Sequence, residues 1–407
     1  MRRVLIVGAG QSGLQLGHLL LAEGYHVTIM SARTPDEIRD GWPTSTQAMF
    51  HVALETERRY GLDLWSAYTP QVTGLRLGLS EQPGVLATAL DVPLEHPAQS
   101  TDQRLKMAAW LELFEDRGGV VHYQGVTTSD LDGLAALRRY DLVVVAAGKG
   151  DLAGLFDRDP ARSRFDRPQR GLAVAYVHGL APDPARLAPH IELTVLPGLG
   201  ELFVIPSLTR SGPCDILFWE AVPGGPLDVI RERLDPAEHL RRILDLARRY
   251  APWVYERAGQ VELAGPRATL AGRFTPTVRY PVAHLPSGGI TLGMADTLVA
   301  NDPVTSQGSN TAAKCADAYL RAILARGDEP FDVEWMTRTF EGFWAETAAA
   351  VTGWTNAALE HPDRLGRLLT EAAGDESLAR RLAGGFSDPN TVVDWYAAPD
   401  LFTHAPC

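Results

Sequence analysis

The stretch RRVLIVGAGQSGLQLGHLLLAEGYHVTIM, residues 2–30, decides the fold class of this chain. Its apolar run from Val4 to Val7 is typical of a buried parallel strand, and a glycine-rich turn, an apolar helix and a second β-rich run follow it. Gly24 ends the helix before the second strand begins. The order strand, turn, helix, strand predicts a Rossmann-like α/β domain at the start of the chain.

Three glycines in the turn occupy the positions of a G-x-G-x-x-G motif. Gly8 permits the sharp turn, Gly10 lets a pyrophosphate approach the backbone amides, and Gly13 lets the helix pack closely on the strand. The helix start then faces the phosphates with free N–H groups. The motif predicts a dinucleotide site, to which we also assign Gln11 and Ser12, but it does not distinguish NAD from FAD.

The second strand ends without the acidic residue that usually holds the ribose hydroxyls in such domains. Ser31 and Ala32 stand at this place, and Asp36 and Glu37 come only later. Arg33 is a candidate for contact with the adenosine or a phosphate, and the alternative is an ordinary surface residue on a loop. The sequence leaves open which residue holds the ribose.

A second candidate cofactor segment lies late in the chain, at GGITLGMADTLVANDPVTSQGSNTAAKCADAYLRAIL, residues 288–324. An apolar strand over 290–294 leads to an aspartate, and a proline-containing loop precedes a helix. An acid at a strand end can bind a cofactor hydroxyl, and the free N–H groups of a helix start favour the negative charge of a reduced flavin. The alternative is an ordinary helix cap after a turn. The residues assigned to cofactor contact here are Asp296, Pro303, Gly308, Ser309 and Asn310.

Composition limits the partners and the compartment. The 407 residues allow two or three structural units, and the formal net charge of −12 argues against a nucleic-acid or anionic-membrane partner. No apolar run approaches the roughly 18 residues of a membrane span, and the N-terminal MRRVLIVGAG is interpreted as a buried strand rather than a signal peptide. The three cysteines form no CxxC pair or metal cluster, so we expect reduced thiols and no metal in a cytoplasmic protein.

The rest of the chain is predicted to divide by secondary structure. Short β runs from about 171 to 222, separated by Gly and Pro, predict an antiparallel sheet, and a helix follows over 236–250. The last part of the chain is helical, with aromatic residues at helical spacing. The predicted parts are a discontinuous cofactor domain over 1–165 and 265–328, a substrate-side sheet over 166–264 with a contribution from 40–97, and a helical C-terminal segment over 329–407.

Together these motifs resemble the glutathione-reductase-type FAD domain of single-flavin aromatic monooxygenases. Within that group, NDPVTSQGSN at 301–310 and FSDPNTVVDWYAAPDLF at 386–402 resemble the two-component styrene and indole monooxygenases, and the resemblance covers essentially the whole chain. STDQRLKMAAWLELFEDRGG at 100–119 is similar to the family's arginine-bearing helix after a FAD-contacting loop. This similarity implies that Gln99 and Arg104 are neighbours of FAD.

The resemblance also implies how the cofactor is used. Single-component hydroxylases carry a second Asp-Gly motif near the strand in YDLVVVAAGKG, whereas Ala147 and Gly148 stand here, as suits a protein that binds no nicotinamide. FAD would arrive reduced from a transient NADH-dependent flavin reductase, and its C4a-hydroperoxide, formed with O₂, would epoxidise indole or styrene-like alkenes. The alternatives are a nicotinamide-dependent flavin oxidoreductase and a styrene-preferring epoxidase of the same family. Whether the chain forms a homodimer is left open.

A loop entering a helix, WPTSTQAMFHVALETERRYG at 42–61, is similar to the family segment that passes over the reactive edge of the flavin. The styrene-preferring branch carries Asn, Val and His at alternating positions of this loop, and the indole-preferring branch carries Ser, Gln and Met. The resemblance to the second branch implies that Gln47 bonds the indole N–H and that Met49 is an apolar wall. The alternative is that Gln47 stabilises the loop and Met49 belongs to the core. The residues assigned to the pocket for a small aromatic substrate are Ser45, Gln47, Met49, Val72, Leu75 and Ala98.

Overall fold

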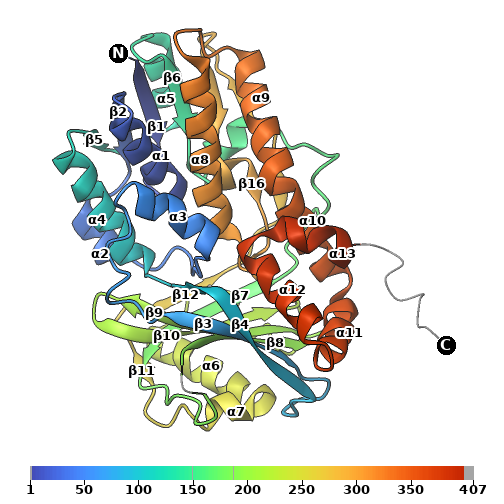
Figure 1. The fold of residues 1–407 in the computed structure, drawn as a ribbon. Coiled ribbons are helices and arrows are strands. Elements are labelled where there is room, and N and C mark those ends of the chain that lie inside the picture. The colour runs from blue at the N-terminus through green and yellow to red at the C-terminus, as the bar shows by residue number, and fades with distance from the viewer. Residues whose placement is uncertain (1, 149, 187, 398–407) are drawn as a thin grey trace.

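The computed structural model describes residues 2–148, 150–186 and 188–397, which form two sheets joined by helices (Figure 1). The first sheet has the order β14-β15-β6-β1-β2-β5, and all its pairs are parallel except that of β14 with β15. This mixed α/β arrangement confirms the predicted fold class. The strands are β1 Arg3–Val7, β2 His26–Ser31, β5 Val120–Tyr123, β6 Leu142–Val145, β14 Val282–His284 and β15 Ile290–Gly293.

Strand β1 is central because its side chains are buried on both faces. Val4, Leu5 and Ile6 are fully buried, as the apolar run predicted. Two helices, α1 Gln11–Ala22 and α8 Gly308–Arg326, lie side by side on one face of the sheet (Figure 1). The glycine turn between β1 and α1 therefore opens at the carboxyl edge of the sheet, beside the start of α8.

The second sheet has eight strands in the order β11-β7-β10-β9-β8-β3-β4, with β12 also paired to β7. The predicted antiparallel pattern holds for β7 to β10, but β3 runs parallel to β8. Its direction is not set by a hairpin with β8, because β3 comes from a distant part of the chain. The strands are β3 Val72–Leu79, β4 Thr88–Ala98, β7 Gly171–His178, β8 His190–Leu196, β9 Gly200–Thr209, β10 Gly212–Ala221, β11 Glu262–Leu263 and β12 Thr269–Gly272. The pairing of β12 carries this sheet past the predicted boundary at 265.

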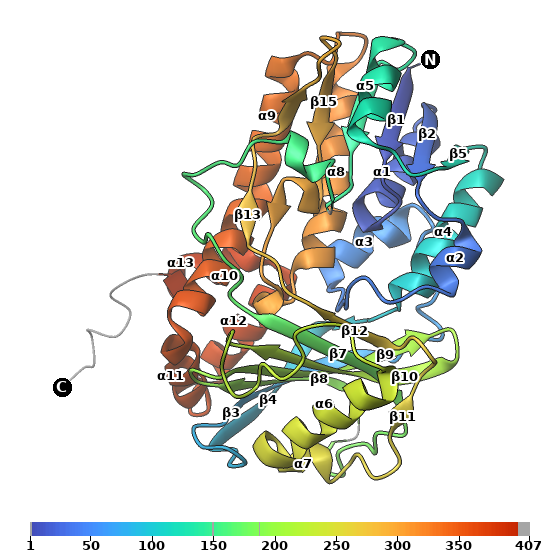
Figure 2. The same cartoon turned by 180° about the vertical axis from the view of Figure 1, so that it is seen from behind.

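The two faces of the second sheet have different coverings. Helices α6 Pro236–Tyr250 and α7 Pro252–Tyr255 lie on the outer face (Figure 2), where Ile243 packs near Trp219. The other face turns toward the first sheet and the C-terminal helices. This inner face is where a pocket between the two sheets can form.

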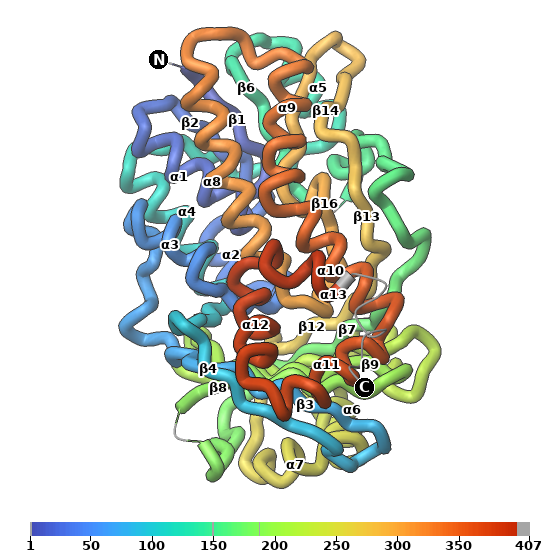
Figure 3. Tube along the Cα trace, turned by 45° about the vertical axis from the view of Figure 1, so that its right-hand side comes forward, coloured from blue at the N-terminus to red at the C-terminus, as the bar shows by residue number. Residues whose placement is uncertain are grey.

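The C-terminal helices connect the two sheets (Figure 3). Helix α9 packs on α8, so Trp335 and Phe340 join the core of the first sheet, whereas Trp354 of α10 joins the core of the second. The helices are α9 Val333–Phe343, α10 Ala349–Glu360, α11 Pro362–Ala372, α12 Glu376–Ser387 and α13 Val393–Ala397. The end of the family-like segment, residues 398–402, lies outside the described residues.

Two expectations about composition can be compared with the structure. Cys214 and Cys315 are buried free thiols, as expected, and Cys407 lies outside the described residues. Among the helices of the described residues, none combines the length and the apolar character that a membrane span requires.

Candidate functional site

The three glycines of the turn after β1 have different roles: two are required by the packing of the fold, and one leaves room for a ligand. Gly8 has φ +122°, and a Cβ on it would lie 2.5 Å from the carbonyl oxygen of Ala146. A Cβ on Gly13 would lie 2.2 Å from the carbonyl oxygen of Gly8. A Cβ on Gly10 would meet nothing within 4 Å, and its φ of −92° suits any residue. The fold itself requires Gly8 and Gly13, whereas Gly10 leaves open space at the turn.

The start of α1 offers backbone donors beside that space. The first bond of the helix runs from the N–H of Leu14 to the carbonyl oxygen of Gly10, at 3.0 Å, and no side chain caps the start. The N–H groups of the three preceding residues, Gln11, Ser12 and Gly13, therefore point out of the helix end. Such an uncapped start favours a phosphate.

The carboxyl ends of three parallel strands meet at the same crevice. Strand β1 lies between β2 and β6. The chain places β2 on one side of β1 and later places β6 on the other side, and ligands of such sheets bind at this switch point. Asp296 follows β15, and a Cβ on Gly148 would lie 2.6 Å from its Cβ. Ala295 before it has φ +48°, which is strained for a residue with a side chain. The predicted Asp296 thus lies beside Gly148, which follows β6 at the carboxyl edge of the sheet.

The start of α8 forms the opposite wall of the crevice. The side chain of Asn310 at this helix start bonds to backbone groups of the protein. Its Nδ2 donates to the carbonyl oxygens of Ala48 at 2.8 Å and Ser306 at 3.2 Å, and its Oδ1 accepts from the N–H of Phe50 at 2.9 Å. The side chain therefore fastens the loop before α3, His51–Arg59, to the start of α8. Only the backbone N–H of Asn310 remains a candidate for the cofactor.

The other predicted residues at this helix start keep their open geometry. Helix α8 has no side-chain cap, and its first bond, from the N–H of Thr311 to Gln307, leaves the N–H groups of Gly308 and Ser309 pointing outward. Pro303 begins the short 3₁₀ turn η3, Pro303–Thr305, that leads to this start.

The two arginines assigned to the cofactor lie in different surroundings. Arg104, on α4 Gln103–Asp116, pairs with Asp102 at 2.6 Å and is largely buried. Arg33 is exposed on the loop after β2, and its Nη1 would lie 3.3 Å from a Cβ on Gly41. Arg104 is already neutralised by Asp102, so a phosphate is a more natural partner for Arg33.

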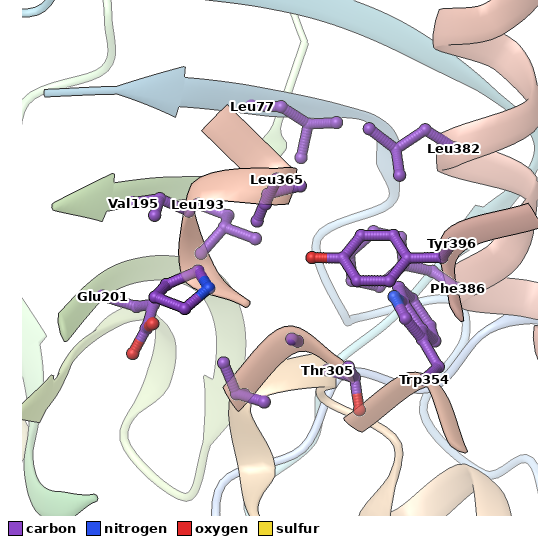
Figure 4. A pocket seen from close by; sticks show the side chains of 13 residues that line it. Leu77, Leu193, Val195, Glu201, Thr305, Trp354, Leu365, Leu382, Phe386 and Tyr396 are labelled. Carbon is purple, nitrogen blue, oxygen red and sulfur yellow. The ribbon is translucent and has the colours of Figure 1, made fainter. Parts of the chain in front are cut away.

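An apolar cavity lies between the second sheet and η3, and it has two parts. The inner chamber has about 250 Å³ free of protein atoms and the outer chamber about 490 Å³, and both volumes include space open to solvent (Figure 4 shows the outer chamber). The inner chamber is lined in part by Ala48, Phe50, Leu75, Ile191, Phe203 and Ser306. It therefore touches both the loop held by Asn310 and the loop before α8.

The structure does not gather the six predicted pocket residues around one chamber. Leu75 lines the inner chamber, while Val72 and Ala98 face each other across β3 and β4 and are fully buried. The carbonyl oxygen of Ser45 accepts a bond of 3.0 Å from the hydroxyl of Tyr176. Sequence reasoning missed Ala48 and Phe50, since a resemblance at alternating positions directs attention to their neighbours.

Gln47 and Met49 fit different interpretations. Gln47 is 4% exposed, and neither atom of its amide has a bond among the described residues, so the amide does not stabilise the loop. Met49 packs with Ala53 and Ala313, and its backbone exchanges bonds of 2.8 and 3.0 Å with Gln99. The core interpretation is supported for Met49, and its place in the pocket stays a prediction.

Gln99 holds this loop from the other side. Its Nε2 donates to Asp63 at 3.2 Å, and its Oε1 is buried without a partner among the described residues. The free oxygen is consistent with the predicted contact to FAD but does not test it.

A buried ion pair behind the glycine turn was not predicted. The Nζ of Lys106 lies 2.5 Å from Oε1 of Glu57, and the side chain of Gln11 donates to the same oxygen at 2.9 Å. Burial raises the pKa of Glu57, although Lys106 opposes this effect. The three residues tie α1, α3 and α4 together, while Oε1 of Gln11 is buried without a partner among the described residues, so its contact with the cofactor stays a prediction. The sequence LETERR around Glu57 resembles a solvated helix face and gives no signal of this burial.

A second buried group of charges lies under η3. Arg170 holds Glu201 with two bonds of 2.7 and 2.8 Å, and Asp302 and Glu220 are buried close to this pair. Burial, with the charge of Glu201, raises the pKa of Asp302 from 3.8 to about 7, and Arg170 only partly opposes it. The pKa of Glu220 is raised as well, because it is fully buried and near the other two carboxyl groups.

We expect Asp302→Asn to remove part of the pH dependence of stability. A raised pKa in the folded state gives stability that is complete below pH 3.8 and is lost as the pH rises through about 7. Asparagine keeps an oxygen for the N–H of Val304 but has no charge. The melting temperature of the variant relative to that of the native chain should rise between about pH 4 and 7 and level off above pH 7. The exposed Asp116→Asn is the control, and parallel curves for all three proteins would contradict the burial of a titrating Asp302.

Solved structures share this fold. A variant of the flavin-dependent brominase Bmp2 aligns with a TM-score of 0.67 at 15% identity and covers 95% of each chain. A flavoprotein/dehydrogenase from Cytophaga hutchinsonii aligns with a TM-score of 0.68 at 14% identity and covers 98% of this chain and 96% of its own. The fold is that of the flavin-dependent monooxygenases and halogenases.

The sequence comparisons relate the chain to one family. Residues 148–257 match the family model described as "Styrene monooxygenase A putative substrate binding domain". Styrene monooxygenase StyA from Pseudomonas fluorescens is 29% identical over an alignment of 409 positions, which covers 98% of this chain and 96% of StyA. The chain is therefore similar to styrene monooxygenases over nearly its whole length. Together with the open glycine turn, this similarity indicates FAD as the cofactor.

Proposed function

We propose that this protein is the cytoplasmic epoxidase component of a two-component monooxygenase that acts on indole and, less well, on styrene-like alkenes. Its FAD arrives reduced from a separate NADH-dependent flavin reductase. The observation that carries the proposal is the open space at Gly10, at the carboxyl edge of the first sheet. The similarity of the chain to styrene monooxygenases supports the same conclusion.

The residues divide the work of binding and shielding. The turn at Gly8, Gly10 and Gly13 and the start of α1 hold the pyrophosphate. The free N–H groups at the start of α8 would stabilise the negative charge of the reduced flavin. Bound FAD would activate O₂ and supply the oxygen atom that is added to the C2=C3 bond of indole. The apolar inner chamber keeps water away from that reaction.

The dependence on a reductase has a direct test. Under anaerobic conditions, the protein mixed with FAD and NADH should leave the flavin absorbance unchanged, and a flavin reductase should bleach it. Admitting air and indole should then give indigo. Rapid bleaching without the reductase would overturn the proposal in favour of a nicotinamide-dependent oxidoreductase.

Preference for indole is assigned to Gln47. Its buried amide has no partner among the described residues, so the N–H of indole would satisfy its oxygen, and styrene has no such donor. One buried hydrogen bond contributes about 0.5 to 1.5 kcal/mol, which corresponds to roughly a three- to tenfold preference.

We expect Gln47→Val to narrow the ratio of kcat/KM for indole over styrene by about three- to tenfold, mainly by weakening indole. The melting temperature should not fall, because the amide that is removed makes no bond in the structure. Competition between the two substrates measures the ratio, and the exposed Gln82→Val is the matched control. An unchanged ratio would remove Gln47 from the pocket.

A further inference from the structure

The inner and outer chambers adjoin, and one aromatic ring separates them. Leu77, Leu193 and Phe386 line both chambers. The ring of Phe386 lies 5.7 Å from that of Phe50, which lines the inner chamber, and 5.1 Å from that of Trp354, which lines the outer one. Phe386 thus lies between the inner and the outer chamber.

The outer chamber contains a buried hydroxyl that no described residue satisfies. Tyr396 of α13 is 1% exposed, and its hydroxyl has no partner among the described residues. Figure 4 shows this hydroxyl pointing into the chamber. The hydroxyl of Thr305 on the same wall is already bonded to Thr355 at 2.8 Å. An unsatisfied buried hydroxyl destabilises the protein until a ligand or water bonds to it, so Tyr396 indicates a ligand group at this place.

The charges around the chamber select the kind of group. Glu201 also lines it, and its carboxylate is held by Arg170 beside the buried Asp302 and Glu220. None of the described residues that line the chamber is basic, so an anionic substituent would lose its hydration without gaining a positively charged partner. A neutral hydroxyl or amino group can donate to Glu201 and accept from Tyr396. The phenol remains a donor at neutral pH because burial, and secondly Glu201, raises its pKa.

We propose that the outer chamber is a subsite for a neutral hydroxyl or amino substituent on the substrate ring. The double bond that reacts lies in the inner chamber, and the remote end of the ring reaches past Phe386 to Tyr396 and Glu201. The inference rests on the proposed function, since it takes the inner chamber as the place of the reacting bond.

The test compares 5-hydroxyindole with 5-methylindole, which have nearly the same shape. Isothermal titration of the full chain should show the hydroxyl compound binding about three- to tenfold more tightly. Tyr396→Phe should abolish that difference and leave the binding of 5-methylindole unchanged. The variant should fold normally, because the hydroxyl makes no bond in the structure. Equal binding of the two compounds to the native chain, or a difference that persists in the variant, would overturn the subsite.

Thr352→Val is the matched control, because it also removes a buried and unpartnered hydroxyl from the C-terminal helices but does not line the chamber. It should keep the difference between the two compounds. Turnover of indole with a reductase is measured separately. If indole is turned over but Tyr396→Phe does not change the difference in binding, the subsite is refuted and the proposed function is kept. If Tyr396→Phe abolishes the difference but indole is not turned over, the subsite is kept and the proposed function is refuted.

Discussion

Replacing Gly10 by valine is expected to abolish FAD binding and lower activity at least about 100-fold, while the chain remains folded. A side chain at this position meets no protein atom within 4 Å, and the extended backbone there suits valine. The new side chain therefore occupies only the space through which the pyrophosphate reaches the start of α1. Titration of FAD measures the binding, and thermal unfolding measures the fold.

Gly13→Ala is the informative comparison for that experiment. Its Cβ would lie 2.2 Å from the carbonyl oxygen of Gly8, so α1 would have to move away from β1. We expect this variant to lose stability as well as FAD. Unimpaired FAD binding by Gly10→Val would show that the open space at the turn is not the cofactor site.

The second large effect is expected at the buried pair of Glu57 and Lys106. Glu57→Gln leaves the ammonium group of Lys106, which is 3% exposed, without a counter-charge. Breaking such a pair costs about 3 to 5 kcal/mol of the free energy of unfolding. Urea unfolding at neutral pH measures this loss.

The double variant Glu57→Gln with Lys106→Met should recover most of the lost stability, because no buried charge remains. It should also bind FAD nearly as the native chain does, because the two substituted side chains lie behind the glycine turn and not in its open space. If the single variant is as stable as the native chain, the pair is not closed in solution. Additive losses in the double variant would show that the two side chains act independently.

The features that the sequence predicted are those that local backbone chemistry dictates. Gly8 adopts a backbone angle that favours glycine, and α8 begins at Gly308 as expected. The Asn310 bonds to Ala48 and Phe50 could not be predicted in the same way, because they join residues about 260 positions apart. Nothing in the local pattern distinguishes an asparagine that contacts a cofactor from one that holds a loop.

The pocket was harder to predict than the cofactor turn, for a related reason. Which of two neighbouring side chains faces a chamber depends on the register of the bridge between Met49 and Gln99. That register places Ala48 and Phe50 on the chamber wall, and Met49 packs against Ala313 of α8. A family resemblance transfers the positions but not this register.

The three bonds of Asn310 make one amide group the shared boundary of the predicted cofactor site and the proposed substrate chamber. A molecule that displaces the start of α8 must also move the strand-like segment from Ala48 to Phe50, because the same side chain holds both. By thermodynamic linkage, if the bound cofactor changes the affinity for the substrate by some factor, the bound substrate changes the affinity for the cofactor by the same factor. The order in which cofactor and substrate arrive then alters the rates of filling, and the final occupancy is the same by either route.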